Sequence, residues 1–539
     1  MDSFCFDRLP PIEHQPVRDW GGVPELTYPD VMNCAAELLD SMIEGGRGDR
    51  TVFQFADGRW TYRHLYETSN RIARVLIEDL GLIPGNRVLL RGPNNPMLAA
   101  CWFGILKAGG VVVCTMPMLR ERELRYVADK AEIKLALTDT RFADECTAAM
   151  LTKADGSERE GAQVVHFNSD AHLSLEPLMR DKSADFINHD TAAEDIAIVA
   201  FTSGTTGEGK GTMHSHRDIM SITDTFPRYV LKPVEDDLFC GSPPLAFTYA
   251  LGGLLLFPMR YGASSLLLEQ PTPPNLLNAI EEYRPTICFT APTAYRAMLG
   301  MLADHDITSL RKCVSAGEVL PLVVFEAWEK ATGMRIIDGI GATEMLHIFI
   351  SAAGDDIRPG ATGKVVPGYE ARVVDDEGKE VPRGTVGKLA VRGPTGFRYL
   401  DNLDQQMKYV QNGWNLTGDS YKMDVDGYFW YQARTDDMII SGGYNIAGPE
   451  VENVLVEHPA VLECAVVGVP DKDRGHVVKA HVVLKPGHKG NSKMVKELQD
   501  FVKARIAPYK YPRKVEFTDA LPRTATGKLQ RFRLREKKK

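Results

Sequence analysis

The sequence predicts an α/β protein with a large N-terminal domain of mainly parallel sheets flanked by helices. A small β-subdomain ends that domain, and a small mobile α+β C-terminal domain follows it. Apolar β-branched runs alternate with helix-like segments, a turn-rich stretch follows, and the charge changes sign near residue 438. At 539 residues the chain is too long for one ordinary core, and 44% hydrophobic with 25% charged residues argues against disorder.

Short apolar runs separated by helical patterns favour βαβ units and a largely parallel sheet. Helices are expected over 33–42 and 97–107, and strands over 88–90, 111–114, 196–201, 265–268, 286–289 and 311–315. Residues 367–393 predict hairpins instead, because Asp-Glu-Gly and Pro-Arg-Gly turns interrupt them. Beyond them, helices over 449–458 and 493–505 and strands over 463–469 and 479–484 predict a compact α+β unit. The expected division is residues 1–433, a hinge at 434–437, and residues 438–539.

Charge and cysteine usage restrict the class of protein. From Met438 onward 20 Lys and Arg face 11 Asp and Glu, a net of +9 on a chain whose net charge is −9, which suggests an anionic partner for that part. The negative net charge and the lack of a recognition motif give no support for nucleic-acid binding. The nine cysteines form no CxxC pair, so reduced, buried thiols are expected.

The N-terminal segment and the longest uncharged run indicate where in the cell the protein is expected. The N-terminus carries acidic residues and prolines where a signal peptide needs a basic start and an apolar core. The longest uncharged run, 238–259, contains three prolines and three glycines, which favours buried strands and turns over a spanning helix. The chain is therefore expected to be cytoplasmic, neither secreted nor membrane-spanning.

A glycine-rich loop follows the strand expected over 196–201. Residues 202–211 (TSGTTGEGKG) combine glycines that turn N–H groups inward, hydroxyl donors, and the charge of Lys210, which together predict a polyphosphate cradle. The P-loop NTPase pattern is nearly met, but Gly211 stands where the Mg²⁺-binding hydroxyl is needed. The next residues, TMHSHRD, also predict no clear helix. A P-loop NTPase is therefore disfavoured.

Four further motifs follow in order: 341–344 (GATE), 417–419 (TGD), 434–442 (RTDDMIISG) and 522–528 (PRTATGK). With the loop, they resemble the signatures of the acyl-adenylate-forming superfamily, which includes acyl- and aryl-CoA synthetases, nonribosomal adenylation domains and luciferases. The resemblance covers nearly the whole chain. It implies that a carboxylate attacks the α-phosphate of ATP, a step that requires charge neutralisation and in-line geometry.

The resemblance assigns roles residue by residue. Lys528 is implied as the adenylation catalyst, Thr343 as a donor to the α-phosphate and Glu344 as the Mg²⁺ ligand. Asp419 and Arg434 are implied to bind the ribose. The implied phosphate loop is Thr202, Ser203, Gly204, Thr205, Thr206, Gly207 and Lys210, and the implied adenine site is Ala316, Gly317, Glu318, Asp338, Gly339 and Ile340. Many relatives have Tyr where this chain has Ile340, so adenine loses an aromatic stacking face.

The second half-reaction is implied to transfer the acyl group to the thiol of coenzyme A. In the superfamily the C-terminal domain swings about a hinge, here Asp436, and presents a glycine-rich face, here Ser441, Gly442, Gly443 and Tyr444. The glycine pair suits close backbone approach to pantetheine. A carrier domain would need about 80 further residues, and no segment of that length follows Lys528 in the sequence. Free CoA or a separate carrier protein is therefore the expected acceptor.

The acid is indicated by a more specific likeness. Residues 338–350 (DGIGATEMLHIFI) are similar to benzoate-type CoA ligases, and residues 9–11 with 33–40 are most like 2-aminobenzoate-CoA ligases. Aromatic and aliphatic walls suit a ring, with Thr248 or His347 near a polar substituent. The predicted lining is Phe247, Thr248, Tyr249, Ala316, Gly341, Met345, Leu346, His347 and Ile348.

Other functions remain open at this stage. A small aliphatic acid is the weaker choice of substrate, and a stand-alone ligase that loads a carrier protein is the alternative enzyme. A non-catalytic nucleotide-binding relative is expected to lack Lys210, Glu344 or Lys528, and all three are present. The resemblance leaves monomer and homodimer open.

Overall fold

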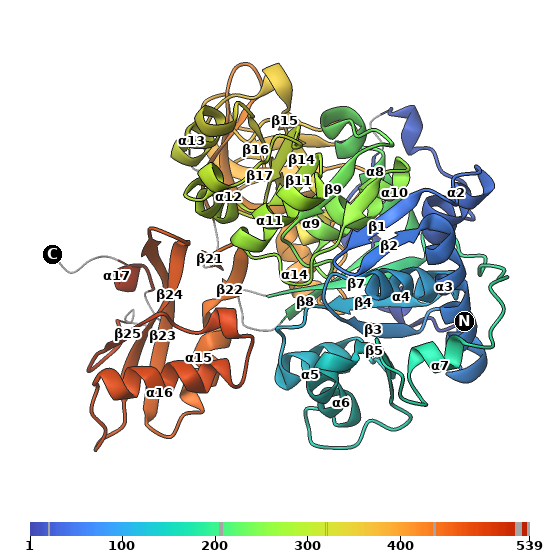
Figure 1. Cartoon of the computed structure of the whole chain (residues 1–539). Coiled ribbons are helices and arrows are strands. Elements are labelled where there is room, and N and C mark those ends of the chain that lie inside the picture. Colours follow the sequence, from blue (N-terminus) through green and yellow to red (C-terminus); the bar gives the residue numbers. More distant parts are fainter. Residues whose placement is uncertain are drawn as a thin grey trace.

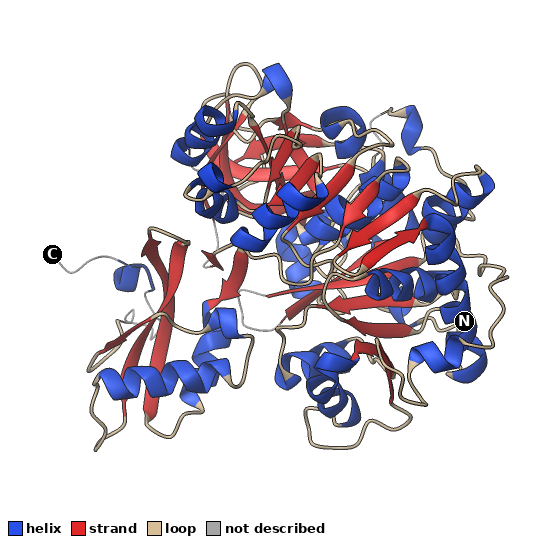
Figure 2. Ribbon diagram, viewed as in Figure 1, coloured by secondary structure: helices blue, strands red, loops and turns tan. Residues whose placement is uncertain are grey.

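Two mainly parallel sheets build the large N-terminal part, and a separate antiparallel sheet with its helices forms the C-terminal part beside it (Figure 1). The computed structural model describes residues 1–19, 22–203, 209–318, 320, 322–434, 438–522 and 531–535. Helices cover the faces of both large sheets (Figure 2). This architecture confirms the predicted α/β class with a β-subdomain and a small C-terminal domain.

The larger sheet has nine strands, and its central strands from β13 to β1 run parallel. In spatial order they are β15 (Lys364–Val365), β14 (Ile348–Ser351), β13 (Ile336–Gly341), β12 (Lys312–Ser315), β11 (Ile287–Thr290), β9 (Leu238–Gly241), β10 (Ser264–Leu266), β1 (Thr51–Phe55) and β2 (Gly58–Thr61). Ligands of open parallel sheets bind beyond the carboxyl ends of the strands, so the residues after β9, β11, β12 and β13 are the first place to look for a site.

The second large sheet has six strands, of which the first five in spatial order are parallel. They are β6 (Gln163–Phe167), β5 (Leu135–Asp139), β3 (Arg87–Arg91), β4 (Val111–Thr115), β7 (Ile196–Ser203) and β8 (Gly209–Ser215). The last strand, β8, returns antiparallel to β7. The chain therefore continues as a strand after the glycine-rich segment, whereas a P-loop NTPase would open a helix there.

Some helices of the N-terminal part, namely α3, α4, α8, α11 and α14, begin at a residue whose side chain caps them. Before α4, the Asn95 side chain accepts a hydrogen bond from the N–H of Leu98, and Pro96 takes the first helical position. The helices are α1 (Phe4–Asp7), α2 (Ser41–Glu44), α3 (Tyr62–Arg74), α4 (Pro96–Lys107), α5 (Glu121–Lys130), α6 (Ala143–Leu151), α7 (Leu175–Met179), α8 (His216–Thr223), α9 (Thr248–Ala250), α10 (Phe257–Arg260), α11 (Pro273–Tyr283), α12 (Pro292–Leu299), α13 (Leu322–Thr332) and α14 (Leu403–Tyr409).

The two smaller sheets are mainly antiparallel. The β-subdomain contains β16 (Glu370–Val374), β17 (Val386–Arg392), β18 (Val410–Gln411), β19 (Trp414–Met423) and β20 (Phe429–Arg434). The C-terminal part contains β21 (Met438–Ser441), β22 (Tyr444–Ala447), β23 (Val461–Asp471), β24 (Gly475–Leu484), β25 (Lys514–Phe517), α15 (Gly448–Val456), α16 (Ser492–Lys503) and α17 (Arg531–Arg535). Its buried residues, such as Val451, Val478 and Leu498, form a hydrophobic core of their own.

Two sequence predictions need correction. A helix does begin at His216, because the Ser215 and Asp218 side chains form a capping box that the TMHSHRD pattern concealed. Residues 248–260 are helical rather than strands and turns. Gly252 and Gly253 do not break this helix; they let it pack closely, since a Cβ on Gly252 would lie 2.3 Å from Cδ2 of His347.

The cysteines and the apolar helices bear on two further sequence predictions. All nine cysteines are unpaired, eight are buried, and Cys114 is half-buried, which confirms the predicted free thiols. Within the described ranges, no helix combines the length and apolar character that a membrane crossing requires.

Gly253→Ala should destabilise the protein although alanine favours helices. Its Cβ would lie 2.5 Å from Cδ1 of Phe289, a fully buried ring of β11, so the core is overpacked. We expect the free energy of unfolding to fall by about 1–3 kcal/mol in urea titrations. Gly300→Ala is the matched control, because its Cβ would approach nothing closer than 3.9 Å. A Gly253 variant as stable as this control would contradict the close packing.

Candidate active site

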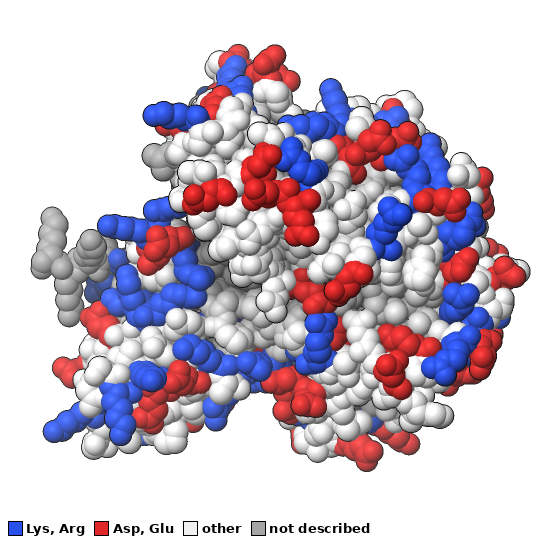
Figure 3. All heavy atoms as spheres, viewed as in Figure 1, with Lys and Arg blue, Asp and Glu red and all other residues white. Residues whose placement is uncertain are grey.

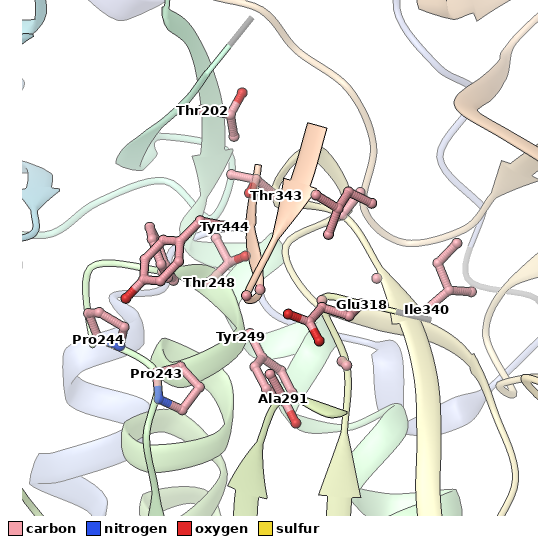
Figure 4. Close-up of a pocket in the computed structure, with 18 of the residues that line it drawn as sticks. Thr202, Pro243, Pro244, Thr248, Tyr249, Ala291, Glu318, Ile340, Thr343 and Tyr444 are labelled. Carbon is pink, nitrogen blue, oxygen red and sulfur yellow. The ribbon is translucent and has the colours of Figure 1, made fainter. Parts of the chain in front are cut away.

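A cavity of about 580 Å³ lies beyond the carboxyl ends of the parallel strands, with the C-terminal part forming one wall (Figure 4). It gathers residues from four of the five sequence motifs, those at 202–211, 341–344, 417–419 and 434–442, which are far apart along the chain. The predicted residues that line it are Thr202, Phe247, Thr248, Tyr249, Ala316, Gly317, Glu318, Asp338, Gly339, Ile340, Gly341, Thr343, His347, Ile348, Asp419, Gly442, Gly443 and Tyr444.

Other predicted residues lie elsewhere. Met345 and Leu346 are fully buried and lie outside the cavity lining. Ser441, Lys210 and Glu344 also lie outside the lining. The structure describes Ser203 and Arg434 by their main chain alone. Gly204, Thr205, Thr206, Gly207, Asp436 and Lys528 lie outside the described residues.

Strand β8 makes main-chain and side-chain contacts with the 398–400 loop and with the turn at Thr343, on the side of the cavity where a nucleotide is predicted to bind. The carbonyl of Gly211 accepts from the N–H of Leu400, and the N–H of Met213 donates to the carbonyl of Arg398, both at 2.8 Å. Nε2 of His214 lies 2.8 Å from the carbonyl oxygen of Thr343. Burial lowers the pKa of His214 to about 4, so the ring is neutral at pH 7 and Nε2–H donates to that carbonyl. The Thr343–Glu344 turn is thereby fixed to the strand that carries Lys210.

A buried ion pair reinforces this connection. Arg398 donates to the Asp218 carboxylate, and both side chains are almost completely buried. Asp218 lies in the first turn of α8, which follows β8 directly, whereas Arg398 belongs to the loop before α14. Removing one partner would leave a buried charge with only a longer contact, Asp218 with Arg18 at 3.5 Å or Arg398 with Glu194 at 3.9 Å, so the ion pair holds the loop against β8.

The Glu344 carboxylate is oriented by Tyr399, whose hydroxyl donates to Oε1 at 2.9 Å. Its second oxygen takes no part in that bond. Among the described residues no group of three or more His, Cys, Asp or Glu gathers for a metal. A single oriented carboxylate nevertheless suits Mg²⁺, which commonly takes one or two protein carboxylates and completes its shell with phosphate and water.

Two acidic side chains on the cavity wall are strongly affected by burial. Burial raises the pKa of Asp338, in β13, to about 8, and its Oδ1 has no hydrogen-bond partner among the described residues. Burial likewise raises the pKa of Glu318 to about 7, although Thr293 donates to it through both N–H and Oγ1 at 3.2 Å. The Glu318 carboxyl points into the cavity (Figure 4). These groups present hydrogen-bonding edges in an otherwise desolvated space.

Hydrogen bonds hold two rings in place on the side of the cavity where the carboxylic-acid substrate is predicted to bind. The Tyr249 hydroxyl lies 3.1 Å from the carbonyl oxygen of Val314, which holds the ring in place. Nε2 of His347 donates to the carbonyl of Tyr249 at 3.2 Å, and burial lowers the His347 pKa to about 3, so this ring is neutral. His347 is therefore partly a satisfied core histidine. These rings line the same cavity as Ala316 and Ile348.

The C-terminal part closes the cavity with its glycine-rich loop. A Cβ on Gly443 would lie 3.3 Å from Oε1 of Glu318, and this residue has a positive φ of 81°. Only glycine adopts that backbone without strain at such a close approach. The Tyr444 ring meets the edge of Phe247, with centroids 6.2 Å apart.

Sequence reasoning missed part of the lining. It did not find the residues that follow β9 and β11, namely Ser242, Pro243 and Ala291, although strand-end positions in a parallel sheet are a usable signal. It also missed Glu123, Glu450, Tyr509 and Lys510. Lone charged residues in helices carry no local signal for a contact between distant parts of a chain.

Comparison with known proteins agrees with this site. The AMP-binding enzyme family matches residues 44–399, and the AMP-binding enzyme C-terminal domain matches residues 450–528. The chain belongs to this adenylate-forming superfamily.

Individual relatives extend over nearly the whole chain. The benzoate–CoA ligase of Thauera aromatica is 36% identical over 95% of this chain and 97% of its own length. A mitochondrial acyl-coenzyme A synthetase of Mus musculus is 32% identical over 95% of this chain and 92% of its own. The crystal structure of an anthranilate CoA ligase in complex with anthranoyl-AMP is similar with a TM-score of 0.73 at 34% identity, covering 95% and 98% of the two chains.

Asp338→Asn should stabilise the protein at alkaline pH. Folding raises the Asp338 pKa from 3.8 to about 8, so ionisation opposes folding increasingly as the pH rises through that window. The variant lacks this penalty, and we expect its free energy of unfolding to exceed the wild type's by about 1–3 kcal/mol at pH 8. The difference should vanish near pH 4. Urea titrations from pH 4 to pH 8 measure it.

Asp424→Asn is the control with the opposite sign. Burial raises the Asp424 pKa, but hydrogen bonds from Trp430 and Tyr428 outweigh burial, so the net shift is downward. That variant should lose stability at neutral pH and lose less in acid. A constant difference between Asp338→Asn and wild type across the pH range would show that Asp338 does not titrate as stated.

Proposed function

We propose that this protein is an ATP-dependent aryl-CoA ligase that forms an acyl-AMP and then transfers the acyl group to coenzyme A, releasing AMP and pyrophosphate. The observation that carries the proposal is the single cavity in which nucleotide-side residues, an aromatic-walled pocket and the glycine-rich loop face one another. In this reaction one carboxyl group must first reach the α-phosphorus of ATP and then the thiol of CoA, and this cavity is bordered by a surface suited to each substrate.

The first half-reaction joins the acid to AMP. An acid oxygen attacks the α-phosphorus of ATP, the bond to pyrophosphate breaks, and the charge that builds on the phosphate oxygens must be neutralised. Thr343 donates to the α-phosphate, Asp419 receives the ribose hydroxyls, and Lys528 brings a positive charge between acid and phosphate. Glu344 would hold Mg²⁺, which lowers the charge of the leaving group when bound.

The acid is proposed to be aromatic, of the benzoate or 2-aminobenzoate type. Support comes from the fixed Tyr249 ring and from Phe247 and the small Gly341, which line the same cavity. The hydroxyl of Thr248 is the polar group on this side for a ring substituent. Relatives named for benzoate and anthranilate agree with this choice.

The second half-reaction passes the acyl group to the thiol. The sulfur attacks the carbonyl carbon, AMP leaves, and the thiol proton goes to solvent or to the departing phosphate. The positive φ of Gly443 and its approach to Glu318 support a narrow passage for pantetheine. Lys and Arg side chains gather where the C-terminal part borders the hollow (Figure 3), which suits the phosphates of CoA.

One alternative substrate has an observation in its favour. The mouse relative is named as an acyl-coenzyme A synthetase without reference to an aromatic acid. A small aliphatic acid would fill the pocket less completely than a ring and would leave the aromatic walls in contact with water, so we rank it second.

The test is CoA-dependent AMP release with ATP and Mg²⁺ across single acids: benzoate, 2-aminobenzoate, hydroxybenzoates and short fatty acids. We expect AMP and thioester with the aryl acids, and a loss of acyl-AMP formation of at least about 100-fold in Lys528→Ala, the scale of one lost charge-stabilising donor. Lys503→Ala, on the exposed surface of α16, is the control and should retain full activity.

Each other outcome has a distinct meaning. AMP release with fatty acids alone would exclude the aryl assignment and keep the two-step reaction. Acyl-AMP formation without thioester from free CoA would point to a carrier protein as the acceptor. Full activity in Lys528→Ala would contradict the assigned catalyst.

A further inference from the structure

A buried lysine joins the two parts of the chain at the rim of the cavity. Lys510 is 4% exposed, and its Nζ lies 2.5 Å from Oε1 of Glu123 on α5 and 2.6 Å from Oε1 of Glu450 on α15. The other oxygen of Glu123 accepts from the N–H of Ala507 at 2.9 Å. One carboxylate of the N-terminal part therefore holds two donors of the C-terminal part.

The Glu123 carboxylate is oriented before this contact forms. It lies in the first turn of α5, where its Oε2 also accepts from the N–H of Arg120 at 2.9 Å. This is the glutamate half of a capping box, and the positive end of the helix dipole stabilises its negative charge. The side chain is 9% exposed, so its bonds are little weakened by water. In Figure 1, α5 lies at the edge of the N-terminal part that faces α15.

Contacts lead from this ion pair to the glycine-rich loop. Tyr509, next to Lys510, stacks on Tyr444 with centroids 4.1 Å apart and planes 27° apart. Tyr444 in turn meets Phe247 of the acid pocket. Fixing Lys510 therefore fixes the stacked pair that supports the loop over the cavity.

We infer that Glu123 and Lys510 are positioning residues for thiol transfer: their ion pair holds the C-terminal part in the orientation that sets Gly443 and Tyr444 against the acid pocket. The inference rests on the proposed two-step function. Because the two residues belong to different parts of the chain, any rotation that presents another face of the C-terminal part separates them. Lys510 then keeps Glu450, so opening leaves no unpaired buried lysine.

Glu123→Gln tests the inference with little change of shape. The amide oxygen still accepts from the N–H groups of Arg120 and Ala507, but the negative charge facing Lys510 is lost. We expect single-turnover transfer from preformed acyl-AMP to CoA to slow at least about tenfold, while acyl-AMP formation stays within about twofold. Lys510→Met should do the same, and the double variant should be no slower than either single one, because the two residues act through one contact.

The control removes a charge from the same boundary at an exposed place. Glu457 of the C-terminal part pairs with Arg122 of α5, and both side chains are about half exposed, at 45% and 51%. Glu457→Gln should change thiol transfer by less than about twofold. Equal losses in both half-reactions, or unimpaired thiol transfer in Glu123→Gln, would overturn the inference.

A measurement without substrate separates this inference from the proposed function. Labels attached through non-natural amino acids at Leu173 and Leu462, which are 74% and 54% exposed, report the distance between the two parts. The wild type should give one main distance, and Glu123→Gln a broader distribution. An unchanged distribution would overturn the role of the ion pair even if no acid were activated, whereas broadening without any acid activation would remove only the proposed function.

Discussion

The antiparallel return of β8 along β7 is the constraint on which the nucleotide side of the cavity depends. A helix after the glycine-rich segment would leave no strand edge there for the loop at residues 398–400 to join. Because a strand follows, its main chain bonds to Arg398 and Leu400, and His214 reaches across to the carbonyl of Thr343. Tyr399, carried by that loop, then orients Glu344. The β7–β8 hairpin thus sets the separation between Lys210, which is predicted to bind phosphate, and Glu344, which is predicted to bind the metal.

Two buried carboxyl groups, Asp218 in the scaffold and Asp338 on the cavity wall, have pKa values shifted in opposite directions. Asp218 lies deeper than the cavity acids, yet its pKa is lowered, because burial, which raises it, is outweighed by Arg398 and Arg18. Asp338 has no cationic partner in hydrogen-bond contact, so burial prevails and its pKa rises. The scaffold acid is therefore a fixed charge, and the cavity acid is available as a neutral donor or an anionic acceptor to a ligand edge. Such a division is expected where a site must be rigid at its base and adaptable at its surface.

The sequence was sufficient for the fold class, most strands and the motifs of the cavity, because each leaves a local pattern. The strands over 87–91 and 111–115 show as β-branched runs, and the glycine-rich loop shows by composition. It was insufficient for the helix at 248–260, because Gly252 and Gly253 resemble breakers until His347 and Phe289 are packed against them. Met345 and Leu346 were predicted to line the acid pocket, but both are fully buried and lie outside the cavity lining.

Contacts between the two parts of the chain lie beyond any local pattern, and their chemistry suits an interface that opens and closes, as the proposed two-step function requires. A purely apolar seam would be costly to open, since all the area it buries would return to water at each turnover. An isolated buried ion pair would be costly in another way, because opening would leave a charge without a partner. Lys510 avoids both difficulties by binding Glu450 of its own part together with Glu123 of the other. If the interface opens, Lys510 would exchange one carboxylate for water and Glu123 would exchange one ammonium for water. Closing would recover a geometry supported by the capping box of α5 and by the stacking of Tyr509 on Tyr444.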